Sequence, residues 1–243
     1  MKFAVQLYSL RGMAEREGAE AVLSAVAEAG YDGVEFAGFY GKTPREMKEL
    51  LARYKLAAYS AHIGAKETEA QLPYIDELGI GAVYVPWADK ASFDDAARYD
   101  EMLGDMRKAN GLCAERGVLF GYHNHAHEFE DGKDRLAKLL SDAPYLKSEL
   151  DVFWATVAGL DPVAYMRGLE GRLSCVHIKE AAKEDPAHIA QPVVGEGAVD
   201  MAGVFAEMKR QGIGTAVLEV EQYPCGEAEY LRRSLENMKK LAK

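Results

Sequence analysis

The sequence is poor in cysteine and has no long apolar run. Its three cysteines, Cys113, Cys175 and Cys225, are widely spaced and form no CxxC pair, which argues against a disulfide framework and a thiolate zinc site. No apolar segment approaches the ~20 residues that a membrane helix needs, and the apolar run in MKFAVQLYSLRG is too short for a signal peptide. We therefore expect a soluble, cytoplasmic protein with no membrane partner.

The sequence also lacks a basic excess. It has 29 basic and 39 acidic residues, giving a formal net charge of −10, which repels phosphate backbones. Nucleic acid is therefore not an expected partner. With 49% apolar residues, a chain of 243 residues can bury a sizeable core. We expect one domain that covers residues 1–243.

Short apolar, β-branched or aromatic runs recur along the chain and predict eight strands. They are FAVQL from residue 3, GVEFA from 33, LAAYSAH from 56, AVYVP from 82, VLFGYH from 118, LKSELDV from 146, LSCVHI from 173 and AVLEVE from 216. Predicted helices separate these runs, and strict alternation of strand and helix indicates a parallel sheet. Eight units in about 250 residues is the size of a closed (β/α)8 TIM barrel.

The predicted helices have recognisable ends. Thr43-Pro44 with Glu46 forms a capping box with a first-turn proline, and Asp161-Pro162 opens another helix. Several helices stop at a glycine just before the next strand, as in AEAGYDGVEF and KRQGIGTAVLEV. A doubly wound open sheet is the alternative fold, but QLYSLRG after the first strand is not a GxGxxG phosphate loop.

Polar residues stand at the predicted C-terminal ends of the strands, where barrel enzymes place their active sites. Burying such groups without partners costs several kcal/mol, and a shared metal ion would remove that cost. His, Asp and Glu without thiolates suit Mn²⁺, Mg²⁺, Co²⁺ or Zn²⁺. The candidates are Gln6, Glu35, His62, His123, Asp151, His177, Lys179, Glu219 and Glu221.

The stretch GYHNHAHEFEDG holds half of the six histidines of the chain. On an extended strand His123, His125 and His127 would share one face, but we expect the strand to end near residue 124 or 125. We interpret His123 as a metal ligand, His125 as part of the substrate pocket, and His127 as solvated. The alternative is a polar loop that happens to be rich in histidine.

Seven motifs, in order, resemble the sugar phosphate isomerase/epimerase family of the xylose isomerase-like TIM barrel superfamily. They are QLYSLR, YDGVEFAGFYG, YHNHAHEF, LDVFWATVAG, VHIKEA, GEGAVD and LEVEQY, and the similarity runs from about Phe3 to Leu241. The resemblance implies a divalent metal on the last four strands and carbon-acid chemistry beside a sugar carbonyl. Asp151, His177 and Glu219 fall on ligand positions, and His123 falls where many relatives carry glutamate.

The histidine at position 123 bears on the reaction. Epimerases of the superfamily use two facing carboxylates, and an imidazole that binds metal has lost the lone pair that a base needs. Glu128 is a candidate for the missing carboxylate. The signature YHNHxxEF also resembles barrels that act on keto-sugars or inososes by elimination. A metal-dependent isomerase or epimerase that works through an enediolate is therefore our leading hypothesis, and a lyase or dehydratase with the same site is the alternative.

The resemblance and the strand-end positions together suggest roles for the remaining candidates. Glu219 is the expected base, and Lys179, His125 or Glu128 would stabilise or reprotonate the intermediate. Contacts to the sugar are expected from Glu35, His62, His125 and Trp154, each of which could instead have a packing role. A non-catalytic sugar-binding barrel remains an alternative. An abasic-site nuclease is disfavoured because Trp154 stands where such barrels often carry histidine. The identity of the sugar and of the metal stays open, and a homo-oligomer is compatible with the sequence.

Overall fold

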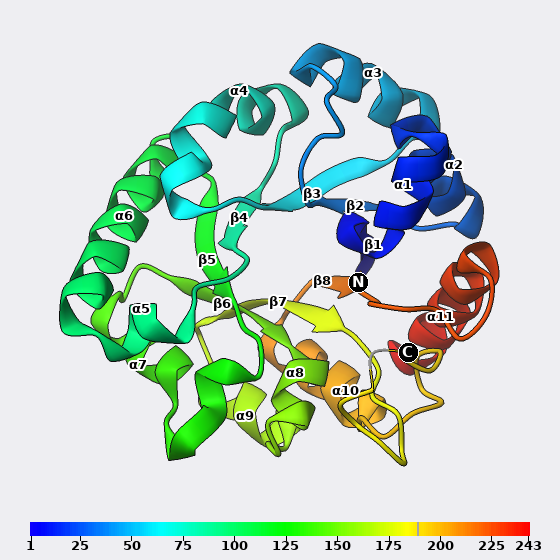
Figure 1. Ribbon diagram of the computed structural model, residues 1–243. Coiled ribbons are helices and arrows are strands. Elements are labelled where there is room, and N and C mark those ends of the chain that lie inside the picture. The colour runs from blue at the N-terminus through cyan, green and yellow to red at the C-terminus, as the bar shows by residue number, and fades with distance from the viewer. Residues whose placement is uncertain (189) are drawn as a thin grey trace.

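The eight strands form a closed parallel barrel, which confirms the TIM barrel expected from the sequence. In the computed structural model, which describes residues 1–188 and 190–243, each strand pairs with the next and β8 pairs with β1 (Figure 1). The strands are β1 Lys2–Gln6, β2 Gly33–Phe36, β3 Ala57–His62, β4 Ala82–Val85, β5 Leu119–His123, β6 Lys147–Asp151, β7 Leu173–Ile178 and β8 Thr215–Leu218. Because β8 closes on β1, the alternative open sheet is wrong.

Helices surround the barrel, and α11 lies beside α2 where the ring closes (Figure 1). The α-helices are α1 Arg11–Glu17, α2 Ala19–Ala29, α3 Pro44–Tyr54, α4 Thr68–Leu78, α5 Lys90–Asp94, α6 Ala96–Ala114, α7 Arg135–Asp142, α8 Val152–Val157, α9 Pro162–Gly168, α10 Met201–Gln211 and α11 Glu227–Leu241. Three 3₁₀ turns, η1 Leu7–Leu10, η2 Ala65–Glu67 and η3 His127–Gly132, lie in the βα loops. Among the described residues, no helix is both long and apolar enough to cross a membrane.

The helix ends follow the local sequence. Thr43 and Glu46 form the predicted capping box at the start of α3, where Glu46 Oε2 accepts the Thr43 N–H at 2.8 Å. Asp161 caps α9 through the N–H groups of Val163 and Ala164. Helix α2 ends at Gly30 with φ 91°, a left-handed conformation that glycine adopts without steric cost. These ends turn the chain back into the next strand and so support the alternation.

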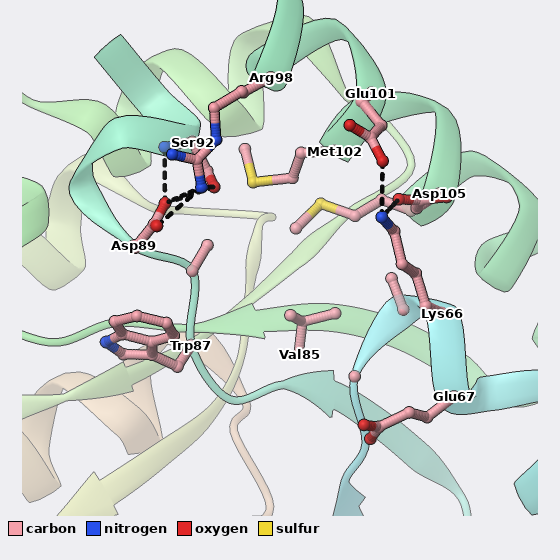
Figure 2. A pocket seen from close by; sticks show the side chains of 14 residues that line it. Lys66, Glu67, Val85, Trp87, Asp89, Ser92, Arg98, Glu101, Met102 and Asp105 are labelled. Atoms are coloured by element: carbon pink, nitrogen blue, oxygen red, sulfur yellow. Dashed lines mark hydrogen bonds and ion pairs between the residues drawn. The ribbon is translucent and has the colours of Figure 1, made fainter. Parts of the chain in front are cut away.

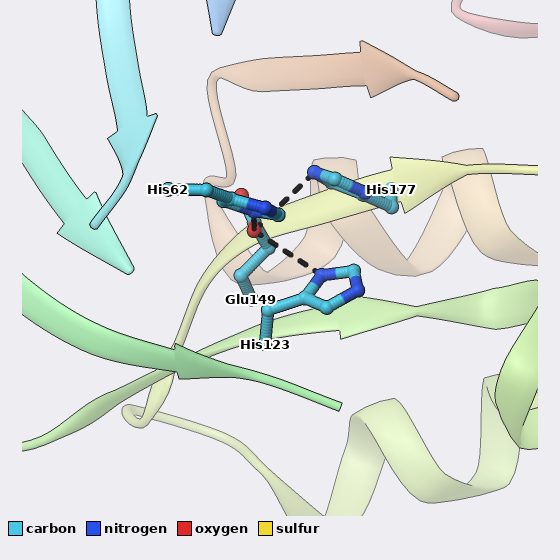
Figure 3. A group of neighbouring side chains, drawn as sticks. All are labelled: His62, His123, Glu149 and His177. Atoms are coloured by element: carbon cyan, nitrogen blue, oxygen red, sulfur yellow. Dashed lines mark hydrogen bonds and ion pairs between the residues drawn. The ribbon is translucent and has the colours of Figure 1, made fainter. Parts of the chain in front are cut away.

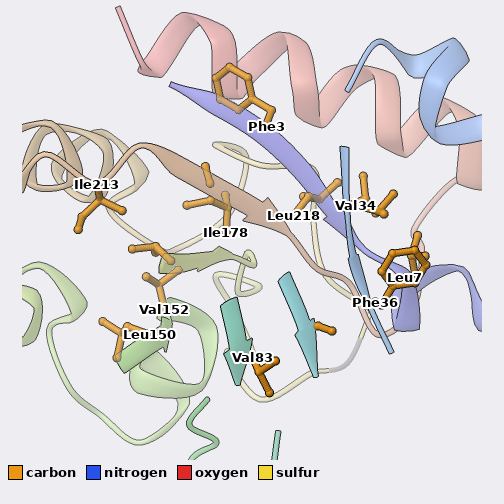
Figure 4. Close-up of a cluster of buried hydrophobic side chains, with 14 of the residues drawn as sticks. Phe3, Leu7, Val34, Phe36, Val83, Leu150, Val152, Ile178, Ile213 and Leu218 are labelled. Atoms are coloured by element: carbon orange, nitrogen blue, oxygen red, sulfur yellow. The ribbon is translucent and has the colours of Figure 1, made fainter. Parts of the chain in front are cut away.

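The main core lies between the outer face of the barrel and the helices. Outward strand residues such as Val34, Phe36 and Leu218 are fully buried, and Figure 4 shows them with neighbouring apolar side chains of the strands and loops. The outer face of the barrel is apolar at these positions because the surrounding helices cover it. The strand residues that alternate with these point into the barrel.

The N-terminal half of the barrel interior is filled by a separate, smaller apolar cluster. Ala4, Tyr84, Cys175 and Val217 are buried together, each from a different strand. Tyr84 fits against Gly121 of the neighbouring strand β5, where a Cβ atom would lie only 2.7 Å from its ring. This packing closes the barrel below the polar residues described next.

Candidate metal centre and active site

The four residues that the sequence suggested as metal ligands lie together at the C-terminal edge of the barrel. His123 ends β5, Asp151 ends β6, His177 lies in β7 and Glu219 follows β8 directly. Asp151 and His177 are paired residues of adjacent parallel strands. All four are buried, and each offers a ligand atom within 4.8 Å of those of the others. The arrangement needs no loop rearrangement because consecutive parallel strands end at one edge.

The donors of this group fit a divalent cation. Asp151 Oδ2 and His123 Nδ1 are buried and make no hydrogen bond in the described part of the chain. Burial raises the pKa of Asp151 to about 7, against the opposing influence of Lys179. An unpartnered carboxylate oxygen in a buried site is costly, and a bound cation would remove the cost. Two imidazoles and two carboxylates suit Mn²⁺, Co²⁺ or Zn²⁺ in particular.

A second set of carboxylates contacts the imidazoles, and Figure 3 shows the Glu149 carboxylate among the rings of His62, His123 and His177. Glu149 Oε2 lies 2.6 Å from His62 Nε2 and 3.3 Å from both His123 Nδ1 and His177 Nε2. The four residues form a second group whose ligand atoms also lie within 4.8 Å of one another. Since His123 and His177 belong to both groups, Glu149 can fix the rings of two candidate ligands from behind.

The sequence interpretation missed Glu149. The available signal was its place two residues before Asp151, because alternation along a strand puts both side chains on the inner face. Burial alone would raise the pKa of Glu149, but His177 and His62 hold it well below its usual range. This carboxylate is therefore ionised, accepts a hydrogen bond from His62 and places its negative charge beside His123 and His177.

Glu35 belongs to the same set of carboxylates. It accepts a hydrogen bond from Gln6 Nε2 at 2.7 Å and another from the Ser60 hydroxyl, and its Oε1 lies 2.7 Å from His177 Nε2. Burial, followed by the charge of Glu149, raises the pKa of Glu35. Glu35 is fully buried. Its position suits the orientation of His177 better than the substrate contact suggested by the sequence.

Lys179 places a buried positive charge beside the ligand group. Its Nζ lies 2.7 Å from Glu221, 3.4 Å from Glu219 and 3.8 Å from Asp151. Burial lowers the pKa of Lys179, but these three carboxylates outweigh burial and raise it. Burial also acts to raise the pKa of Glu219, yet Lys179 and His177 hold it well below its usual range. Glu219 is thus an ionised carboxylate at neutral pH.

A cavity of about 420 Å³ opens over the ligand group. That volume is within the range of small-molecule sites, roughly 300–1,000 Å³. Of the predicted site residues, His62, His123, His125 and Glu219 line it, and the remaining lining residues are Tyr8, Ala37, Pro86, Trp87 and Glu221. Trp154 packs instead against the His125 ring, at a centroid distance of 5.3 Å, and over Lys179. It supports the wall of the site from behind.

The histidines after β5 have three different environments. His123 is in the strand, and His125 lies beside it with a ring that is largely buried, which lowers the pKa of His125 to about 2. His125 is therefore neutral and can hydrogen-bond a hydroxyl group. The prediction that His127 is solvated is wrong, because its Nε2 lies 2.7 Å from the Ala88 carbonyl oxygen and 19% of its side chain is exposed. His127 anchors the loop that follows β4.

Glu128 lies on the other side of β5 from His123. Its Oε1 accepts the Tyr122 hydroxyl at 2.6 Å, and its Oε2 accepts the backbone N–H of His125 at 2.9 Å. The side chain is fully buried. This position does not suit the catalytic carboxylate that the sequence led us to expect. Glu128 instead holds the backbone of the loop that presents His125.

Comparison with known proteins agrees with the architecture. Residues 23–241 match the family described as the xylose isomerase-like TIM barrel, and the chain belongs to this family. An inosose dehydratase of Geobacillus kaustophilus is 21% identical over 88% of this chain and 83% of its own length. The rhizopine catabolism protein MocC of Rhizobium meliloti is 27% identical over 92% of this chain and 81% of its own length.

A solved structure of similar fold is the sugar phosphate isomerase/epimerase of Parabacteroides distasonis. It superposes with a TM-score of 0.80 and 22% identity, and the match covers 100% of both chains. At that identity the likeness establishes the fold. The relatives therefore include enzymes named for elimination as well as for isomerisation.

Proposed function

We propose that this chain is a divalent-metal-dependent lyase that removes the proton beside the carbonyl of a keto-sugar or inosose. The observation that carries the proposal is the position of Glu219, an ionised carboxylate that lines the cavity, belongs to the ligand group and lies beside Lys179. His123, Asp151, His177 and Glu219 would hold the metal. When bound, a divalent cation supplies Lewis-acid polarisation of a carbonyl, which makes the adjacent C–H more acidic.

Glu219 is the base in this proposal. Its Oε2 lies 3.0 Å from His177 Nδ1 and accepts a bond from Lys179 Nζ at 3.4 Å, so within the described part of the chain Oε1 remains for the substrate proton. The Lys179 ammonium keeps the carboxylate ionised and adds positive charge beside the enediolate oxygen that develops as the proton leaves. Both effects follow from a contact that is buried from water.

Elimination then needs a proton donor for the leaving oxygen. The electron pair of the broken C–H bond forms a C=C bond, the C–O bond at the next carbon breaks, and the departing oxygen takes a proton and leaves as water. His62 lines the cavity and its Nε2 lies 2.6 Å from Glu149. An imidazole paired with a carboxylate can carry and deliver a proton, and we assign this role to His62.

The position of Glu128 favours elimination over two-base epimerisation. Epimerisation by two carboxylates requires a second one across the substrate from Glu219, and Glu128 is held behind β5 by Tyr122 and the His125 backbone. The cavity presents His62 and His125 there instead. The kinship with proteins named inosose dehydratase supports the same choice.

Isomerisation is the second candidate, because one base can also return its proton to the neighbouring carbon. The Glu219–Lys179 contact at 3.4 Å favours it, since an ionised carboxylate beside a fixed positive charge can take a proton and give it back. The two candidates share the site and the first step. They differ in whether an oxygen leaves.

Proton exchange in D₂O tests the shared step. Metal-loaded protein is incubated with a panel of ketoses and with an inosose, and NMR follows deuterium incorporation and loss of water. Glu219→Gln should slow exchange by about 10²–10⁴-fold, the usual value of a general base. Glu128→Gln, a buried glutamate that faces away, is the matched control and should retain exchange.

The products separate the candidates. Exchange accompanied by loss of water supports the lyase, and exchange with an isomeric sugar as product supports the isomerase. Equal exchange rates in the wild type and Glu219→Gln would remove Glu219 from the base role and overturn both.

A further inference from the structure

A second cavity adjoins the one over the ligand group, and Trp87 lines both. This second cavity has a volume of about 380 Å³ and lies between the turn η2 and helices α5 and α6 (Figure 2). The first cavity already offers the metal group and enough room for one sugar ring. The second adds comparable space that the reaction centre does not use.

The walls of the second cavity combine apolar surface with planar polar groups. Val85 and Met102 contribute apolar surface, as Figure 2 shows. Around them, Arg98 Nη2 lies 2.7 Å from Asp89 Oδ2, and Lys66 forms ion pairs with acidic residues of α6. Guanidinium and carboxylate groups of this kind can exchange hydrogen bonds with the hydroxyls of a sugar. The cavity therefore suits a polyhydroxylated ligand better than an apolar one.

Trp87 is exposed although its backbone is fixed. Trp87 is 56% exposed. The backbone on either side of it is restrained, because Pro86 precedes it and the carbonyl oxygen of Ala88 accepts the ring N–H of His127 at 2.7 Å. The Trp87 and His127 rings lie 6.0 Å apart. Packing does not explain an exposed indole where the two cavities adjoin. An indole face can stack on the apolar face of a sugar ring.

We infer that the substrate carries two sugar rings. The reacting ring lies over the ligand group, and the second ring stacks on Trp87 and extends into the second cavity toward Asp89 and Arg98. The identity of the reacting ring rests on the proposed function. The second subsite rests on the shared lining residue and the polar walls of the cavity.

Calorimetric titration of the metal-loaded protein tests the second subsite without turnover. The probes are glucose and the disaccharides maltose, cellobiose and trehalose. At least one disaccharide should bind about tenfold more tightly than glucose, an effect of the size that one stacked ring provides. Trp87→Ala should weaken the disaccharide about tenfold more than it weakens glucose and so abolish that preference, and Trp87→Phe should retain part of the preference.

Tyr8→Ala is the matched control. Tyr8 is also exposed and aromatic, at 46%, but it lines the first cavity alone. Its removal should weaken glucose and disaccharide by the same factor. If no disaccharide binds more tightly than glucose, or if Trp87→Ala weakens both by one factor, the inference is overturned.

Titrations on the Glu219→Gln protein separate this inference from the proposed function. A disaccharide preference that persists in Glu219→Gln shows that the subsite binds without the reaction. The same preference in a wild-type protein that exchanges no proton supports the subsite and contradicts only the reaction. Proton exchange on a monosaccharide with no disaccharide preference contradicts only the subsite.

Discussion

The two halves of the barrel interior differ in chemistry although the same strands build both. On β7 the inward residue Cys175 is followed two residues later by His177, and on β8 Val217 is followed by Glu219. One two-residue step, roughly 6.6 Å of strand, separates apolar packing from a charged group. The lower half closes the barrel by packing, whereas the upper half holds polar atoms that packing leaves unpartnered. The half that stabilises the barrel and the half that carries the candidate site therefore follow each other along the barrel axis.

The largest effect on stability should come from placing a charge in the apolar lower half of the barrel interior. Val217→Asp places a carboxylate among Ala4, Tyr84 and Cys175, where no cation is available within the described cluster. We expect a loss of about 3–5 kcal/mol in the free energy of unfolding, as for an uncompensated buried charge. Urea denaturation measures it. Val217→Thr has a similar shape without the charge and should lose about 1–3 kcal/mol; equal losses would mean that the lower half tolerates charge as the upper half does.

Removing a charge from the upper half should have a different signature. Asp151→Asn should weaken Mn²⁺ or Zn²⁺ binding by more than about 100-fold, since even partners outside the ligand shell are worth 10–100-fold. Metal-free protein should not lose stability, because the change removes an unpartnered buried carboxylate oxygen. Calorimetric metal titration and thermal melts with chelator check both parts. Unaltered metal binding would break the comparison between the two halves.

Glu149→Gln should give an intermediate effect. The amide keeps the shape but loses the charged acceptor for His62 and the negative charge 3.3 Å from His123 and His177, so metal affinity should fall by about 10–100-fold. Glu128→Gln is the control, because it is an equally buried glutamate on the other side of β5. It should leave metal affinity within about twofold and lower stability by about 1–2 kcal/mol. Equal affinities in the two variants would show that Glu149 does not position the imidazoles.

The smallest effect should come from the rim, where water screens the charges. Hydrogen bonds from Ser92 and Arg98 lower the pKa of Asp89 to about 2. A carboxyl with a lowered folded-state pKa stabilises the protein above its unfolded value of about 4, and this contribution is lost as pH falls toward 2. Asp89→Asn keeps the helix cap and removes the charge. Its urea midpoint should therefore fall less steeply between pH 4 and pH 2 than that of the wild type; identical slopes would contradict the assignment.

The fold could be predicted because the local sequence of each strand–helix unit marks where its strand and helix begin and end. Apolar runs mark the eight strands, and Gly30 or the Thr43 capping box marks where helices end or begin. The broad set of polar candidates could be predicted because parallel strands deliver their last inward residues to one edge. The family resemblance then selected His123 and Asp151 from that set as ligands, and the structure brings them together.

The sequence could not show how far below the cavity each inward residue lies along the barrel axis. Glu149 lies one step below Asp151, next to a register shift between Ser148 and Glu149, and no single strand reveals which layer faces the cavity. The direction of the loop after β5 was also unreadable, since η3 turns the carboxylate of Glu128 behind the strand. These errors concern three-dimensional layering, which depends on several strands at once.

The pairing of β1 with β8 also sets an order of assembly during synthesis. Phe3 is the partner of Ala216, so the first strand waits for more than two hundred residues before its second neighbour exists. Contacts between residues so far apart in sequence form late, because the entropy of loop closure is lost before the contacts add stability. The emerging chain can gather His123, Asp151 and His177 before then, but Glu219 follows the closing strand. The complete candidate ligand group therefore exists only after the final closure of the barrel, so we expect an incomplete barrel to lack the full metal site.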